Sequence, residues 1–224
     1  MIQLKYLSSK LNFRKVTLSI LLFLSNFYTF GQNEFEGIVK FKIDYKIVNA
    51  SNDIDTSGLP NKSIMYVKNS KSRLEQNSKK ELNIKIYDAT SNTAIVIFNI
   101  YDLGIKSAVK ILSQDVNKLD SLVKGDIITF TKEKKKILGY KCYKVVEEFS
   151  DPQKNSTRTE YYFTTELSNV TRGMPEIGGM ILQRITYTDY VITTTTAVSI
   201  EPKEIPDSLF NVPKEYKLKD YKDL

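Results

Sequence analysis

A single thiol and a few carboxylates are the side chains of this sequence that could do chemistry. The chain has 224 residues, one cysteine and no histidine. The lack of histidine excludes Ser-His-Asp and Cys-His catalysis, histidine-containing zinc sites and the commonest general base. One cysteine also excludes thiolate zinc sites and iron–sulfur clusters, and no Gly-x-Gly or Gly-Lys-Ser/Thr spacing is present to bind phosphate. The sequence therefore predicts a protein that is not an enzyme, with no catalytic residue, no metal site and no cofactor.

The lone Cys142 allows two interpretations. It could be a reactive or intermolecular thiol, or it could be a small buried hydrophobe in a strand. It cannot form an intramolecular disulfide, although an oxidising compartment would permit one. We favour the buried residue, because cysteine is among the most often buried residue types and no histidine is present to activate it.

The carboxylates do not form a catalytic pair. Glu147 and Glu148 are adjacent in a predicted strand, so they point to opposite faces of a sheet. Glu201, Glu204 and Asp207 lie close in sequence and could bind calcium through oxygen atoms, but their spacing matches no calcium loop. A solvated acidic turn is the better interpretation.

The first residues are typical of an export signal. A basic segment precedes an apolar run, Val16 to Leu24, that is too short to span a bilayer. Small residues at Thr29 and Gly31 predict cleavage after Gly31, which leaves residues 32–224 in the periplasm or outside the cell. An uncleaved N-terminal anchor is the alternative, but Asn26 interrupts the apolar run. No cysteine lies near the cleavage site, which disfavours a lipoprotein. No transmembrane span is expected after cleavage.

Charge does not point to a nucleic-acid partner. The formal net charge is +7, but residues 1–31 carry four basic and no acidic residues, so the mature chain is only +3. Four lysines cluster at 132 and 134–136 with Glu133 among them, and no aromatic residues are interleaved for stacking on bases. We predict a solvated hairpin tip there and no nucleic-acid site.

Most of the mature chain has the patterns of β-strands. Glu34 to Val48 alternates, with apolar residues on one parity and mostly charged residues on the other, which indicates a long strand with one wet face. Further strands are predicted at 64–68, 72–76, 82–87, 93–101, 126–132, 139–149, 157–164, 180–187 and 190–200. Residues 201–210 are expected to form a capped turn, with Phe210 and Val212 packing the tail onto the body.

One segment has a helical period instead. Apolar residues recur at three- and four-residue steps between Ala108 and Leu122, with charged residues between them. This pattern predicts a helix over 107–124, with Ser107 as a candidate N-cap and Gly125 placed to end it. Its apolar stripe would lie on the sheet.

These elements predict a single mainly β (α+β) domain over residues 32–224. Short loops between neighbouring strands favour antiparallel pairing. A sheet of this many strands must curl, so it could form a sandwich, a closed barrel or a half-barrel.

A family resemblance narrows the choice. The Gly139-Tyr140-Lys141-Cys142 motif, the 159–166 strand and the closing 206–213 segment resemble the exported proteins of unknown function grouped as DUF4412. The 173–181 run resembles, less closely, the Gly-Leu-Pro-Gly-Leu-Ile signature of a second exported family. Both families are similar in strand order to periplasmic carriers of the LolA and LppX kind. The resemblance implies a curved antiparallel half-barrel with a helix covering its concave face.

If that fold has a cavity, its walls should be apolar. The candidate lining residues are Phe41, Ile43, Tyr45, Met65, Val96, Phe98 and Met180. An ordinary packed core is the alternative for each of them. The function expected on this basis is non-enzymatic binding of a hydrophobic or lipid-like ligand, or of a lipoprotein acyl chain. The alternative is a structural or protein-interaction module that meets another envelope protein.

Overall fold

The computed structural model describes residues 35–48, 55–115, 127–149, 157–167 and 177–223. All of them belong to one compact unit, Glu34–Leu224. The predicted signal peptide, residues 1–31, lies outside the described residues, so its cleavage stays a prediction. In the described ranges, no helix has the length and apolar character needed to cross a membrane.

Strands dominate this unit. The described residues form twelve strands: β1 (Gly37–Ile47), β2 (Lys62–Lys68), β3 (Lys71–Asn77), β4 (Glu81–Asp88), β5 (Thr93–Ile100), β6 (Ile105–Ile111), β7 (Ile127–Ile137), β8 (Tyr140–Glu148), β9 (Arg158–Thr164), β10 (Met180–Tyr187), β11 (Val191–Pro202) and β12 (Leu218–Asp220). Three 3-10 turns accompany them: η2 (Tyr101–Leu103), η3 (Asp207–Phe210) and η4 (Tyr221–Asp223). The strands expected from the sequence match ten of these twelve, and β6 and β12 are the exceptions.

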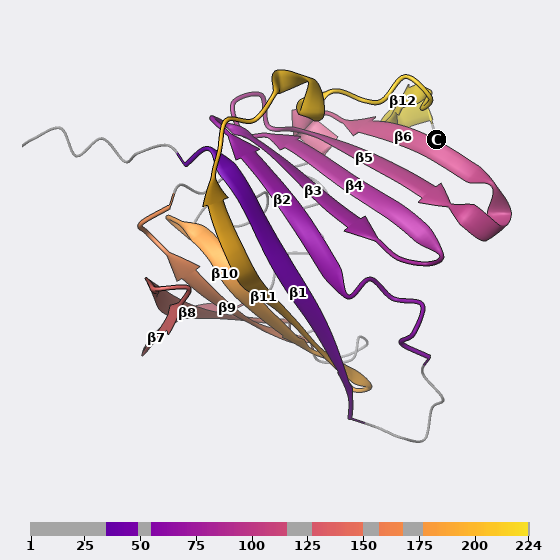
Figure 1. Cartoon of the computed structure of the whole chain (residues 1–224). Coiled ribbons are helices and arrows are strands. Elements are labelled where there is room, and N and C mark those ends of the chain that lie inside the picture. Colours follow the sequence, from indigo (N-terminus) through magenta and orange to yellow (C-terminus); the bar gives the residue numbers. More distant parts are fainter. Residues whose placement is uncertain (1–34, 49–54, 116–126, 150–156, 168–176, 224) are drawn as a thin grey trace, which may run out of the picture. The chain divides into compact units, whose positions relative to one another are not determined.

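All twelve strands lie in one sheet, in the order β12-β6-β5-β4-β3-β2-β1-β11-β10-β9-β8-β7. The first strand, β1, pairs with both β2 and β11 and occupies the middle of the curved sheet (Figure 1). Consecutive strands neighbour each other on both sides of the β1–β11 pair, as expected for hairpin connections. The pair of β12 with β6 is parallel, and the other pairs are antiparallel. The predicted curved and mainly antiparallel sheet is confirmed.

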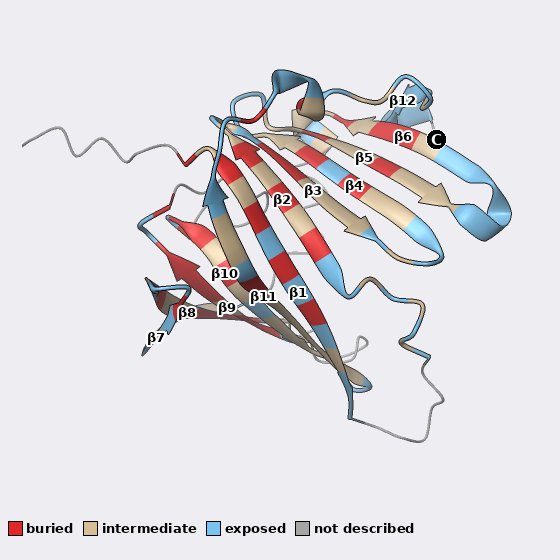
Figure 2. Cartoon of the chain, viewed as in Figure 1, coloured by how far each residue is buried: buried red, intermediate tan, exposed pale blue. Residues whose placement is uncertain are grey.

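Alternation along β1 shows why the sheet has two different faces. Val39, Phe41 and Ile43 are buried, whereas the charged residues between them are exposed (Figure 2). The register from β1 to β6 is continuous, so each face can be followed across these six strands. We call face A the side that carries Val39 and Phe41. Face B is the opposite side.

The C-terminal segment covers face B. Ile205 and Phe210 pack against Ile84, Ile97 and Ala108 in one buried cluster. Polar contacts hold the backbone of the segment at three points: Lys68 Nζ donates to the Ile205 carbonyl at 2.8 Å, Arg73 Nη1 donates to the Leu209 carbonyl at 2.8 Å, and the Ile205 amide donates to Glu36 Oε1 at 2.6 Å. The prediction that Phe210 and Val212 pack the tail onto the body is confirmed.

The helix predicted over 107–124 is wrong in its first part. Residues 107–111 belong to β6, which pairs with β5 on one side and β12 on the other. Residues 113–115 are helical, and residues 116–126 lie outside the described residues. The apolar spacing around Ala108 fits either period, and ladder pairing on both sides of β6 decides for the strand. A helix covering the sheet therefore stays a prediction.

Two turn assignments also need correction. The lysines at 132 and 134–136 lie within β7, and the hairpin tip is at Leu138 and Gly139, with φ angles of 51° and 87°. Glycine adopts such angles at little cost, so Gly139 serves this tight turn between Ile137 and Tyr140. Glu201 belongs to β11 and pairs with Lys40 at 2.7 Å, so it does not lie in an acidic turn.

Candidate ligand-binding face

Three cross-strand rows make up face A between β1 and β6. One row contains Phe41, Ser63, Gln76, Asn83, Phe98 and Ser107. The next contains Val39, Met65, Leu74, Lys85, Val96 and Val109, and the third contains Gly37, Val67, Ser72, Tyr87, Ala94 and Ile111. We call the first one the polar row, because four of its six members are polar. Face A thus has a polar border beside two largely apolar rows.

Six of the seven candidate lining residues lie on this face, but they separate into groups. Phe41 and Met65 join Met180 of β10 in one core cluster. Val96 and Phe98 pack in a second cluster. Ile43 and Tyr45 belong to neither cluster, and the Tyr45 hydroxyl donates to the Pro60 carbonyl at 2.8 Å.

The cluster that holds Phe41, Met65 and Met180 is packed core. Their side chains are between 1% and 8% exposed. Phe35 and Leu167, which lie outside the strands, belong to the same cluster. For these three residues, packing against the protein's own side chains explains their burial, which favours the packed-core alternative over a cavity wall.

The second cluster, which we call the β5–β6 patch, consists of Ala94, Val96, Phe98, Val109 and Ile111. Tyr87 of β4 packs against it. Ala94, Val109 and Ile111 are no more than 7% exposed, and Val96 and Phe98 are partly buried. In the described part of the chain, every member comes from β4 to β6. Among the described residues, each of the other clusters includes a residue from outside the strands, whereas this patch contains strand residues alone.

A half-buried asparagine, Asn83, adjoins the patch. Asn83 is paired with Phe98 across β4 and β5 and lies on the polar row. Its Oδ1 atom is buried and has no hydrogen-bond partner among the described residues. Buried polar atoms in native structures nearly always have a partner, which can be a protein group, a water molecule or a ligand.

Sequence reasoning missed part of this site. The helix predicted over 107–124 includes Val109 and Ile111, so the sequence pattern does not place them beside Val96 and Phe98. Asn83 is a polar residue inside an alternating strand. Its spacing of two and four residues from Lys85 and Tyr87 indicates that all three lie on one face of that strand. That signal becomes useful only when the β4–β5 register is known.

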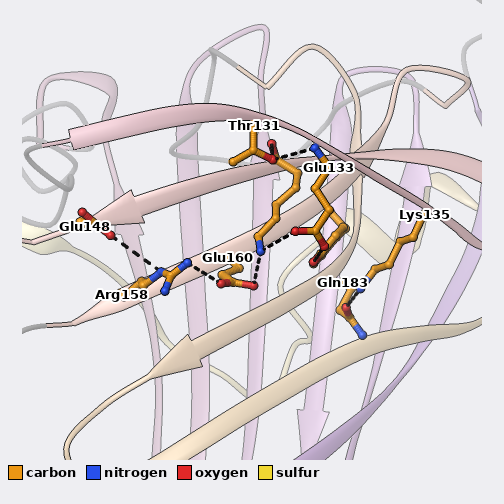
Figure 3. A network of polar contacts seen from close by, with 9 residues as sticks. Thr131, Glu133, Lys135, Glu148, Arg158, Glu160 and Gln183 are labelled. Atoms are coloured by element: carbon orange, nitrogen blue, oxygen red, sulfur yellow. Dashed lines mark hydrogen bonds and ion pairs between the residues drawn. The ribbon is translucent and has the colours of Figure 1, made fainter.

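A second polar cluster lies on the other half of the sheet, on β7 to β10 (Figure 3). Lys144 Nζ is 3.0 Å from a carboxylate oxygen of Glu133 and 3.0 Å from one of Glu160. Arg158 lies 2.7 Å from the other oxygen of Glu160. Burial alone would lower the pKa of Lys144, but hydrogen bonds to the two carboxylates outweigh it and raise that pKa. The cluster is a matched set of charges that ties β7, β8 and β9 together.

Tyr162 and Lys135 extend this cluster. The Tyr162 hydroxyl donates to Glu133, and burial together with this bond raises the pKa of Tyr162 to about 12. Lys135 Nζ lies 3.2 Å from the centroid of the Tyr162 ring and also donates to Gln183. Burial lowers the pKa of Lys135. Each polar group here has a partner within the protein, which is typical of a structural network.

The catalytic candidates remain separate from one another. Glu147 accepts a hydrogen bond from the Tyr161 hydroxyl at 2.8 Å, whereas the exposed Glu148 lies 3.8 Å from Arg158. Cys142 is fully buried, and burial raises the pKa of its thiol, so the buried-hydrophobe interpretation is confirmed. Among the described residues, no group of three or more acidic or cysteine side chains could hold a metal ion.

No protein family and no curated protein matches the chain. Among solved structures, the chain is similar to PNGF-II, with a TM-score of 0.52 and 17% identity over 84% of this chain and 33% of that one. The chain thus spans about a third of the length of PNGF-II, and the likeness is one of fold alone. The resemblance to the two exported families stays a prediction.

Two further solved structures show weaker similarity. LprF from Mycobacterium bovis has a TM-score of 0.35 and 12% identity over 77% of this chain and 89% of that one. The Mycobacterium tuberculosis lipoprotein LppX has a TM-score of 0.34 and 6% identity over 76% of this chain and 89% of that one. At these TM-scores, neither structure supports a conclusion about this chain.

Proposed function

We propose that this chain is an exported envelope protein that binds a hydrophobic or lipid-like ligand on face A without chemistry. The observation that carries the proposal is the β5–β6 patch, whose described members all come from three adjacent strands of one layer. Apolar sheet faces are stable when a second layer or another molecule covers them. The described C-terminal segment covers face B at the same strands, so the proposal places the ligand on face A.

The free energy gained by burying apolar groups indicates how long the ligand's chain should be. Burying one methylene group contributes about 0.8 kcal/mol. Association costs at least about 4 kcal/mol, so a chain of about twelve methylenes leaves roughly 5 kcal/mol of net binding free energy if it is fully buried. We therefore expect a long acyl or isoprenoid chain, which has enough apolar carbon to offset the cost of association, in preference to a small aromatic molecule.

Native mass spectrometry of the mature chain, purified gently from envelope fractions, tests the proposal. We expect a reproducible extra mass that organic extraction removes. Replacing Val96 with Asn should reduce that occupancy, whereas Val198→Asn, a matched change at an exposed position of β11, should leave it unchanged. A mass without ligand that persists after incubation with lipids would refute the proposal.

Export is tested in the same measurement. The intact mass should correspond to residues 32–224 if the signal is cleaved after Gly31. A cytosolic protein with an intact N-terminus would contradict the export proposal.

A protein-interaction module is the second candidate function. The edge strand β7 has 11 residues and pairs only with β8 among the described strands, and it exposes Ile127 and Phe130. A partner strand could add to this edge. However, β7 has an irregular register between Phe130 and Lys134 and is rich in lysine, and both features are typical of edges that resist pairing. Ligand binding on face A is therefore the better-supported function.

A further inference from the structure

The turn that joins β5 to β6 carries the most exposed large apolar side chain among the described residues. Leu103 is 68% exposed, and Tyr101 and Ile105 are each 42% exposed. Every residue from Tyr101 to Lys106 is exposed, and we call this segment the η2 tip (Figure 2). Single exposed apolar residues are ordinary on protein surfaces, but a group of them within one turn is typical of an interaction site.

The η2 tip projects beyond the neighbouring strands. On one side, the β4–β5 ladder ends at the pair of Glu81 with Ile100, just before the tip. On the other side, β12 pairs with residues 108–110 of β6, just after it. Among the described strands, the tip therefore has no ladder partner outside its own hairpin, and it forms a projecting end of the sheet (Figure 1).

Polar contacts fix the conformation of the tip. The Tyr101 amide donates to the Lys80 carbonyl at 2.9 Å, and the Tyr101 hydroxyl donates to Asn77 Oδ1 at 2.9 Å. Gly104 ends the 3-10 turn with a φ angle of 62°, and its amide donates to the Tyr101 carbonyl at 3.2 Å. These contacts hold the turn without the side chain of Leu103, so folding alone does not account for an exposed leucine at this position.

Charges around the tip balance one another. The exposed charged residues of the tip and of the two turns beside it are Lys79, Lys80 and Lys106 against Asp55, Glu81 and Asp102. A strongly charged partner therefore gains little from this surface. Lysine can keep its apolar stem near lipid while its ammonium group stays in water, and the amphipathic ring of tyrosine suits a membrane–water interface.

We propose that the η2 tip is a membrane-docking site that inserts Leu103, Ile105 and the ring of Tyr101 into the interfacial region of a lipid bilayer. A standard protein interface takes about 20 to 30 residues from each partner, far more than this one turn offers. A fluid bilayer can close around a few apolar side chains, which gives weak and reversible binding. The tip lies outside the β5–β6 patch, so the inference does not require a ligand there.

Vesicle flotation of the mature wild-type protein tests the inference. Vesicles of phosphatidylcholine alone, in high salt, minimise adsorption through the net charge of +3. We expect a bound fraction whose partition coefficient Leu103→Asn lowers by about tenfold. That loss corresponds to about 1.4 kcal/mol, near the low end for burying a leucine side chain. Val198→Asn, a change at an apolar residue of β11 that is 52% exposed, should leave the partition coefficient unchanged.

Fluorescence provides an independent measurement, because the chain contains no tryptophan. A single introduced tryptophan therefore reports its own surroundings. In Leu103→Trp, the emission should move to shorter wavelength on vesicles and should be quenched by lipids with brominated acyl chains. In the control Val198→Trp, neither change is expected. This pair keeps the inference testable if Leu103→Asn fails to fold.

The possible outcomes are distinct. Absence of wild-type flotation, or flotation that Leu103→Asn leaves unchanged, would overturn the inference. A dimer in sedimentation velocity that Leu103→Asn dissociates would also overturn it, because the tip would then meet a second copy of the chain. Flotation that depends on Leu103, together with a ligand-free mass after incubation with lipids, would support the inference and refute the proposed function.

Discussion

Replacing Lys144 with Met should destabilise the protein strongly. Lys144 is 12% exposed and lies 3.0 Å from Glu160, which is itself only 8% exposed. At an effective dielectric constant of about 20, that contact has a gross Coulomb attraction of about 5 kcal/mol. Much of the attraction offsets the cost of removing both charges from water. The net loss therefore comes from leaving Glu160 buried without its lysine.

The expected magnitude is about 3 kcal/mol. Removing one partner of a buried pair typically costs about 3 to 5 kcal/mol. Glu160 retains Arg158 at 2.7 Å, which places the loss at the lower end of that range. Lys42→Met is the matched control, because Lys42 pairs with Asp44 on the surface, where both side chains are more than half exposed. Such a pair contributes at most about 1 kcal/mol.

Equilibrium unfolding in urea at pH 7 measures both changes. The reasoning would be refuted if Lys144→Met cost no more than Lys42→Met. Acid provides a second check, since the hydrogen bond from Tyr162 and the contact with Lys144 lower the pKa of Glu133 below its ordinary 4.5. A lowered folded-state pKa contributes stability above the ordinary value and loses it as the pH falls. The difference between wild type and Lys144→Met should therefore shrink below about pH 4.5.

Three further changes test the packing. Gly179→Ala should destabilise the protein by about 3 kcal/mol, because the new Cβ atom would lie 1.9 Å from the Thr164 carbonyl oxygen. Gly178→Ala is the control and should be nearly neutral, because no atom lies within 4 Å of its new Cβ. Thermal unfolding measures both changes. Phe210→Ala should cost about 3 kcal/mol in urea unfolding, because it opens a cavity under the C-terminal segment. Cys142→Ser should lower the melting temperature by burying a hydroxyl group, and native mass spectrometry should show unchanged ligand occupancy.

Strand positions could be predicted from the sequence because half-buried strands leave a period of two. The β1 segment alternates over its whole length, and the predicted range of 34–48 contains the observed Gly37–Ile47. β6 escaped prediction because Ala108 and Val109 are adjacent and both buried, which breaks the alternation and imitates a helical stripe. The strand β12 has three exposed residues and no apolar pattern at all. Its position depends on parallel pairing with β6, which local sequence does not encode.

The candidate site could be predicted only in part, for a related reason. Alternation within the β1 segment places Phe41 on the apolar face of its strand, whereas the 93–101 segment is apolar on both parities and predicts a strand without assigning Val96 to a face. Sequence also does not reveal whether Phe41 and Val96 lie on the same face of the sheet. The register across the four ladders from β1 to β5 decides that question. Packing then divides the two residues, with Phe41 in the packed cluster and Val96 in the patch. Asn83 lies beside the patch because it is paired with Phe98 in the β4–β5 ladder, which the local sequence does not reveal.

The two faces of β4 to β6 are expected to have different roles: packing of the C-terminal segment on face B, and the proposed ligand binding on face A. Face B is covered by the chain itself, and Lys68, Arg73 and Glu36 hold that cover through its backbone, so its attachment does not depend on a ligand. The β5–β6 patch lies on the opposite side of the same strands, on face A. Ligand binding to the folded state alone raises stability by mass action. Phe210→Ala should therefore lower the free energy of unfolding by the same amount with and without ligand. Val96→Asn should reduce the difference in free energy of unfolding between the ligand-bound and the ligand-free protein.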